Sequence, residues 1–134
     1  MKKIVLIGRH HGELFTTLGE ILVGIEYSEF VDIREINFEQ EALPFVRKVD
    51  PNDLYIIVCG VLRLEVTIRE IRRRNLPLVI YTYNHKYCRN HLQDFPGRIF
   101  RKSSYNEIDH TGVELKTPHD LAMDILAQFV LSPS

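Results

Sequence analysis

The sequence predicts a single α/β domain over residues 1–134, with a mostly parallel sheet of about four to five strands flanked by helices. Three short apolar runs carry this prediction: Ile4 to Ile7, Leu54 to Val58, and Leu78 to Tyr83. Each run is continuous, as in a strand that is buried on both faces of a sheet, and segments with helical spacing separate the runs. We therefore expect the three runs to be neighbouring strands.

The first half of the chain alternates strands and helices. After the first run, apolar residues recur at helical spacing and predict a helix through Leu14, Leu18, Ile21, Leu22 and Ile25. Residues Phe30 to Phe38 are half polar and rich in β-branched side chains, which indicates a strand near the sheet edge. A short helix through Val49 should have Pro44 near its start, because proline is disfavoured inside a helix.

A well-marked helix follows the second apolar run. Leu64, Ile68 and Ile71 mark its buried side. The other side is rich in arginine and includes Arg63, Arg69, Arg72, Arg73 and Arg74. Such a face can bind nucleic-acid phosphates, but Glu65 and Glu70 neutralise part of it, and the helix dipole also favours arginine at this end. We interpret it as a solvated surface.

The chain after Asn84 predicts smaller elements. A short helix or loop leads to a strand at Arg98 to Lys102, and Val113 to Leu115 indicates an antiparallel extension. A last helix should begin at Thr117, because a proline follows and Asp120 completes a capping signal. This order of elements is that of a Rossmann-like domain, with parallel strands joined by right-handed crossovers.

Composition argues against several classes of function. The formal net charge is −1, so the chain has no wholesale attraction to duplex nucleic acid or to an anionic membrane. No apolar stretch approaches the roughly 20 residues of a membrane-spanning helix, and the run at Ile4 to Ile7 is too short for a secretory signal. We therefore expect a cytoplasmic protein in which Cys59 and Cys88 are free thiols.

Polar residues that follow the strands predict a binding site. The carboxyl ends of parallel strands share one edge, where ligands bind. The residues expected there are Arg9, His10, His11 and Gly12 after the first strand, Cys59 and Gly60 after the third, and Asn84 and His85 after the fourth. Arginine, histidine and a helix N-terminus suit a phosphate. The predicted ligand is a nucleotide or other phosphorylated molecule, bound without a cofactor or metal, with His10 and His11 as candidate proton-transfer residues.

Other interpretations of these residues stay open. The loop at Arg9 to His11 can be a solvated surface loop that pairs with acids such as Glu13. His85, Cys88 and His91 have the spacing of metal ligands, but structural zinc needs four ligands, which makes a metal the weaker interpretation. His110 follows Asp109 in a predicted turn and is a further candidate base.

The sequence lacks two common motifs that bind nucleotides through their phosphates. The glycine-rich patterns of dinucleotide-binding proteins and P-loop NTPases do not occur. Cys59 is a weak candidate nucleophile, because a phosphatase loop would place an arginine where this chain has Glu65.

The segment Arg9 to Gly12 supports two resemblances to known families. Histidine phosphatases carry Arg-His-Gly after their first strand, but this chain reads Arg-His-His-Gly and is short for that fold. The chain is similar to small CRISPR-associated proteins of the ring-nuclease group, in which the first strand runs into Arg-His-Pro-Gly. The matching segments are IGRHHG at 7–12 and DLYIIVCGVLRL at 53–64.

The ring-nuclease resemblance implies a compact Rossmann-like homodimer that binds, and can cleave, cyclic oligoadenylate without a metal. Arg9 and His10 carry over as phosphate-contacting positions, whereas His11 stands where the family has proline. Two functional hypotheses follow. One is a ligand-binding protein, with metal-independent phosphodiester cleavage as its possible reaction. The other is a non-catalytic dimeric scaffold that docks through the aromatic residues Tyr83, Tyr87, Phe95 and Phe100.

Overall fold

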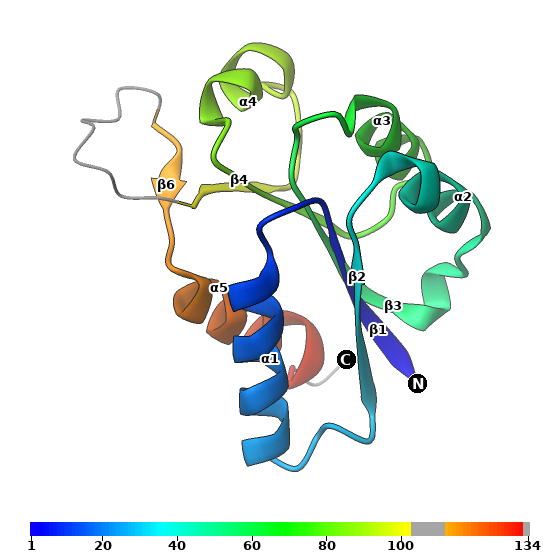
Figure 1. The fold of residues 1–134 in the computed structure, drawn as a ribbon, viewed down its shortest axis with the longest axis vertical. Helices are drawn as coiled ribbons and strands as arrows, with labels where there is room; N and C mark the ends of the chain where they lie inside the picture. Colours follow the sequence, from blue (N-terminus) through cyan, green and yellow to red (C-terminus); the bar gives the residue numbers. More distant parts are fainter. Residues whose placement is uncertain (103–111, 133–134) are drawn as a thin grey trace.

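The computed structural model describes residues 1–102 and 112–132. They form one six-stranded sheet in the order β2-β1-β3-β4-β5-β6, in which all neighbouring strands are parallel. The strands are β1 (Lys2–Ile7), β2 (Val31–Ile36), β3 (Leu54–Cys59), β4 (Leu78–Thr82), β5 (Arg98–Arg101) and β6 (Glu114–Leu115). The sheet runs through the middle of the molecule with helices on either side (Figure 1).

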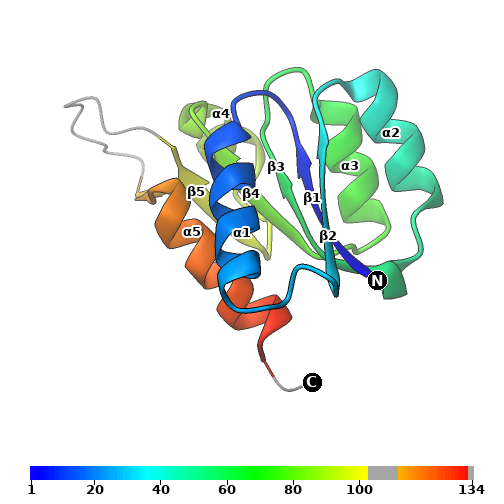
Figure 2. The same cartoon turned by 60° about the horizontal axis from the view of Figure 1, so that its bottom comes forward.

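Helices cover both faces of the sheet (Figure 2). On one face lie α1 (Gly12–Gly24) and α5 (Pro118–Ile125), which continues into η2 (Leu126–Val130). On the other face lie α2 (Glu39–Lys48), α3 (Glu65–Arg73) and α4 (His85–His91), and the short turn η1 (Pro51–Asp53) precedes β3. No helix in the two described segments is both long and apolar enough to cross a membrane.

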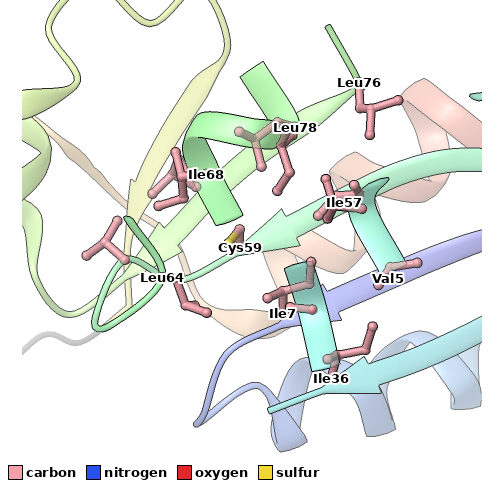
Figure 3. Close-up of a cluster of buried hydrophobic side chains, with 14 of the residues drawn as sticks. Val5, Ile7, Ile36, Ile57, Cys59, Leu64, Ile68, Leu76 and Leu78 are labelled. Carbon is pink, nitrogen blue, oxygen red and sulfur yellow. The ribbon is translucent and has the colours of Figure 1, made fainter. Parts of the chain in front are cut away.

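The three apolar runs are the neighbouring strands β1, β3 and β4, as predicted. Their side chains alternate between two cores because successive residues of a strand point to opposite faces. Val5 and Ile57 pack under α2 and α3 (Figure 3), whereas Ile4 and Ile56 pack under α1 and α5. A strand that is buried on both faces needs apolar residues at every position, which explains the continuous runs.

Two sequence predictions about the sheet need correction. The structure has six strands instead of about four to five, and β6 pairs with β5 in parallel, with Phe100 opposite Glu114, instead of forming an antiparallel extension. β6 has only two residues, and both are exposed. A strand this short has no apolar alternation, so its sequence carries no signal for its direction.

The position of Pro44 also differs from the prediction. It lies inside α2, which begins at Glu39. Proline removes one backbone donor, and the carbonyl that this donor would meet in a regular helix belongs to Gln40. Both Pro44 and Gln40 are exposed, so water can satisfy that carbonyl. The predicted start of the last helix is confirmed, because the Thr117 side chain accepts a hydrogen bond of 3.1 Å from the Asp120 backbone N–H.

Candidate functional site

A crevice of about 790 Å³ lies at the carboxyl ends of the strands. Residues after five strands line it, including Arg9 and His10 after β1, Phe38 and Glu39 after β2, Gly60 to Leu64 after β3, Tyr83 and Asn84 after β4, and Lys102 after β5. Its size falls in the usual range for small-molecule pockets, roughly 300–1,000 Å³. The crevice lies at the edge where the sequence places the predicted site.

Gly8 shapes the loop that brings Arg9 and His10 into the crevice. Its backbone N–H donates to the Ile36 carbonyl at 2.8 Å, which extends the ladder between β1 and β2. Its φ is +117°, and a Cβ at this position would lie 3.1 Å from Leu64 Cδ1. Only glycine adopts this backbone without strain, so the chain can turn sharply here.

Two crevice residues other than glycine also have left-handed backbones. The φ of His10 is 68° and that of Arg63 is 58°. Such conformations cost of order 1–3 kcal/mol and tend to cluster at ligand-binding sites. The loops after β1 and β3 are thus held in strained shapes that direct two basic residues toward the same cavity.

The structure brings together some of the predicted site residues. Arg9, His10, Gly60 and Asn84 all line the crevice. Gly12 begins α1 and is not among the lining residues. The backbone of His85 begins α4 directly after Asn84.

His11 lies beneath the crevice in the protein interior. Only 3% of its surface is exposed, and its ring lies parallel to that of Tyr81 at a centroid distance of 6.2 Å. Nε2 donates to the Ile7 carbonyl at 3.1 Å, which leaves Nδ1 as a buried acceptor with no hydrogen-bond partner among residues 1–102 and 112–132. Burial, reinforced by the charge of Lys102, lowers the pKa of the imidazole to about 3. His11 is therefore neutral near pH 7.

Both cysteines are free, as predicted, and both are buried. The Cys59 side chain lies among Ile7, Leu64 and Ile68 (Figure 3) and does not line the crevice. Burial and the nearby Glu39 carboxylate raise the pKa of the Cys59 thiol far above its usual range. A buried, protonated thiol is a poor nucleophile and a poor ligand for an anion.

Lys102 also lines the crevice, as do Phe38, Glu39, Arg63 and Tyr83, although no sequence pattern assigned these residues to the site. The Lys102 side chain is buried, and its ammonium group donates to the His10 carbonyl. Nζ lies 5.1 Å from the ring centroid of Tyr81 and 5.5 Å from that of Tyr83. Burial lowers the pKa of the Lys102 ammonium to about 8. Among the described residues, no carboxylate forms an ion pair with it.

Arg9 is exposed, but it also lies against an aromatic ring. Its guanidinium carbon lies 5.0 Å from the ring centroid of Phe38. Among the described lining residues the one carboxylate is Glu39, and it accepts 3.2 Å hydrogen bonds from the backbone N–H and the hydroxyl of Thr67, in the first turn of α3. Aromatic rings thus hold Arg9 and Lys102 in place without cancelling their positive charge.

The other sequence candidates lie away from the crevice. Cys88 is buried, and His91 is exposed and stacks on Tyr87 at a centroid distance of 4.3 Å. Within residues 1–102 and 112–132, no group of His, Cys, Asp and Glu side chains is arranged to hold a metal. Asp109 and His110 lie outside the described residues.

Three arginines at the end of α3 bond to other groups of the protein. Arg74 donates to the backbone carbonyls of Val46 and Val49 at 2.6 and 2.9 Å, which joins α3 to the end of α2. Arg73 pairs with Glu70 and Arg72 pairs with Asp94. These pairings fit the interpretation of a solvated surface better than that of a nucleic-acid face.

The four aromatic residues proposed for a docking surface differ in exposure. Phe100 is buried, and Tyr87 and Phe95 are half-buried and pack against the core under α3 and α4. Tyr83 is exposed, but it lies at the crevice. Phe100 therefore drops out of the proposed docking surface. For the other three residues the scaffold hypothesis stays a prediction, since Tyr87 lines one surface hollow with Tyr83 and another with Phe95.

Comparisons with known proteins bear on the fold. No family model and no curated protein matches the chain. The structure resembles a de novo designed Rossmann 2x3 fold protein, solved by NMR in solution, with a TM-score of 0.63 and 14% sequence identity. The match covers 100% of this chain and 97% of the designed one. The fold is Rossmann-like. In a Rossmann-like sheet the crevice occupies the edge where ligands usually bind, but a likeness to a designed protein identifies no ligand.

Proposed function

We propose that the crevice binds a small phosphorylated ligand through Arg9 and Lys102. The observation that carries this proposal is the buried Lys102 ammonium, which lines the crevice and has no carboxylate partner among the described residues. A buried charge is costly unless an opposite charge and hydrogen bonds compensate it. An anion in the crevice would supply both.

Phosphate suits this pair of cations. The planar guanidinium of Arg9 offers parallel donors to two oxygens, and the ammonium of Lys102 keeps donors free after its bond to the His10 carbonyl. Among the described residues, Glu39 forms no ion pair with either cation, and its Oε2 accepts both hydrogen bonds from Thr67. A carboxylate ligand would meet the same charges, but phosphate has more acceptor oxygens to share between them.

Phosphodiester cleavage is the reaction that we propose for this site. His10 is exposed and lines the crevice, so it can reach a ligand, whereas His11 is buried and neutral. His10 is therefore our candidate for proton transfer, and Arg9 and Lys102 would stabilise charge that develops on the phosphate. Cyclic oligoadenylate, which the ring-nuclease resemblance implies, is the first substrate to test.

The binding proposal is tested by titration calorimetry with nucleotides, sugar phosphates, inorganic phosphate and cyclic oligoadenylates. We expect at least one phosphorylated compound to bind. Arg9→Ala and Lys102→Met should each weaken binding roughly 10- to 100-fold, because each removes a charge-assisted hydrogen bond. The matched controls are Arg47→Ala and Lys48→Met, two exposed basic residues of α2, and they should bind like the wild type. Equal affinity in all five proteins would refute the proposal.

A further inference from the structure

Exposed apolar side chains surround the crevice. Phe38, Leu62 and Tyr83 belong to three loops, which follow β2, β3 and β4, and all three line the cavity. Their exposed fractions are 45%, 67% and 53%. One exposed apolar side chain is ordinary on a protein surface, but several around one cavity mark a surface that binds something apolar.

The two aromatic rings of this set contact the cations and the histidine of the crevice. Phe38 lies against the Arg9 guanidinium, with 5.0 Å between the guanidinium carbon and the ring centroid. The Tyr83 ring meets the His10 ring edge-on at 6.0 Å and lies 5.5 Å from Lys102 Nζ. A phosphate held by Arg9 and Lys102 would therefore lie beside both aromatic rings.

A phosphate group alone would leave these apolar surfaces in water. A sugar phosphate would place hydroxyl groups against them without burying apolar area. A planar heteroaromatic ring could stack on Tyr83 or Phe38 while its phosphate contacts the cations, and a mononucleotide fits within a cavity of about 790 Å³.

We infer that the ligand is a nucleoside phosphate whose base stacks in a subsite formed by Phe38, Leu62 and Tyr83. This inference rests on the proposed phosphate site and narrows its ligand class from phosphorylated molecules in general to nucleotides. Stacking makes no use of the hydrogen-bonding edge of the base, so the subsite should accept more than one base.

The test compares ligands that share a phosphate but differ in the ring. Titration calorimetry measures the affinities of AMP, GMP, CMP and UMP, of ribose 5-phosphate, and of adenosine. At least one nucleotide should bind about fivefold or more tightly than ribose 5-phosphate, because one stacked base contributes at least that factor. Adenosine should bind more weakly than AMP.

Variants then assign the difference to the subsite. Tyr83→Leu keeps an apolar side chain and removes the ring, so it should lower nucleotide affinity about fivefold to tenfold, and by a larger factor than it lowers ribose 5-phosphate affinity, because only the nucleotide loses a stacked base. Leu62→Ser should act in the same direction. Phe30→Leu is the matched control, because Phe30 is also an exposed aromatic residue but does not line the crevice.

The outcomes separate this inference from the proposed function. If nucleotides and ribose 5-phosphate bind equally and Arg9→Ala weakens both, the phosphate site stands and the base subsite is rejected. If nucleotides bind better but Tyr83→Leu and Leu62→Ser change nothing, the base lies elsewhere and the inference is also rejected. If no phosphorylated compound binds, the proposed function and this inference both fail.

Discussion

The Lys102 ammonium donates a hydrogen bond to the backbone carbonyl of His10, which lies 92 positions earlier in the chain. The bond joins the end of β5 to the loop after β1, on the far side of β3 and β4 in the sheet. A backbone carbonyl orients the ammonium without neutralising it, so Lys102 reaches the crevice with its full charge.

Phosphate binding should weaken as pH rises through about 8, because the free protein loses the Lys102 proton there. Calorimetry with inorganic phosphate between pH 7 and 10 measures this. Lys102→Arg should keep its affinity to higher pH, because arginine stays protonated. The rings and imidazoles near Lys102 belong to His10, His11, Tyr81 and Tyr83, and they remain in that variant. A decline of the same size and midpoint in Lys102→Arg would contradict the assignment of the effect to Lys102.

His11 should make the fold sensitive to acid. Its pKa is about 3 in the folded protein against 6.5 in the unfolded chain. Between these values the unfolded state binds more protons, so the free energy of unfolding falls as pH drops below 6.5. The loss should be on the order of 3 kcal/mol between pH 6.5 and pH 4. Urea unfolding at several pH values measures it, and His11→Phe should show a smaller pH dependence than the wild type.

Two glycine substitutions should change stability in opposite directions. Gly8→Ala should lower the free energy of unfolding by roughly 1–3 kcal/mol, because φ is +117° and Leu64 leaves little room for a Cβ. Gly19→Ala should raise it by about 0.5–1 kcal/mol, since Gly19 lies in α1 and a Cβ there meets no atom within 4 Å. Denaturant unfolding of both variants checks the signs. An unchanged free energy of unfolding in Gly8→Ala would show that the loop after β1 can rearrange.

Arg74 should stabilise the fold more than its neighbour Arg73. Arg74→Met removes two hydrogen bonds to the carbonyls of Val46 and Val49, at a cost of about 1–3 kcal/mol. Arg73→Met breaks a surface pair with Glu70, and such pairs contribute little. Thermal and urea unfolding of the two variants would reveal the difference, and equal stabilities would contradict a role for Arg74 in joining α3 to α2.

If the protein cleaves a phosphodiester, His10→Ala should lower kcat by about 100-fold or more with little change in binding. Arg9→Ala should weaken both binding and turnover, because this residue would contact phosphate in the ground and transition states alike. Turnover of cyclic oligoadenylate, measured with and without EDTA, tests the mechanism. Loss of activity on chelation that zinc restores would argue for a metal-dependent site instead.

The sequence predicted the centre of the fold better than its edges. β1, β3 and β4 are buried on both faces, so their apolar runs show directly in the sequence. β6 has two exposed residues and offers no such pattern. Pro44 was misplaced because proline inside a helix is tolerated where the freed carbonyl faces water, which depends on the exposure of the helix face and not on the residue itself.

The location of the candidate site could be predicted, because the order and direction of the strands determine which loops meet at one edge of the sheet. Arg9 and His10 follow β1 directly, and the parallel sheet places that strand end at the crevice. The directions of side chains were not predictable in the same way. Cys59 is the last residue of β3 and lies two positions after Ile57. The two side chains therefore point to the same face of the sheet, into the core. Lys102 was missed because β5 is short and half polar, so its place beside β4 could not be inferred.

The separation of 92 positions between His10 and Lys102 has a consequence for folding. A chain that has formed β1 to β4 lacks a complete crevice until β5 adds to the sheet. A ligand that contacts both residues binds the fully assembled sheet in preference to partly assembled forms, and so favours the docking of β5. Hydrogen exchange at the backbone amides of β5 should therefore slow when ligand binds, and these amides would report occupancy of the crevice from the opposite end of the chain.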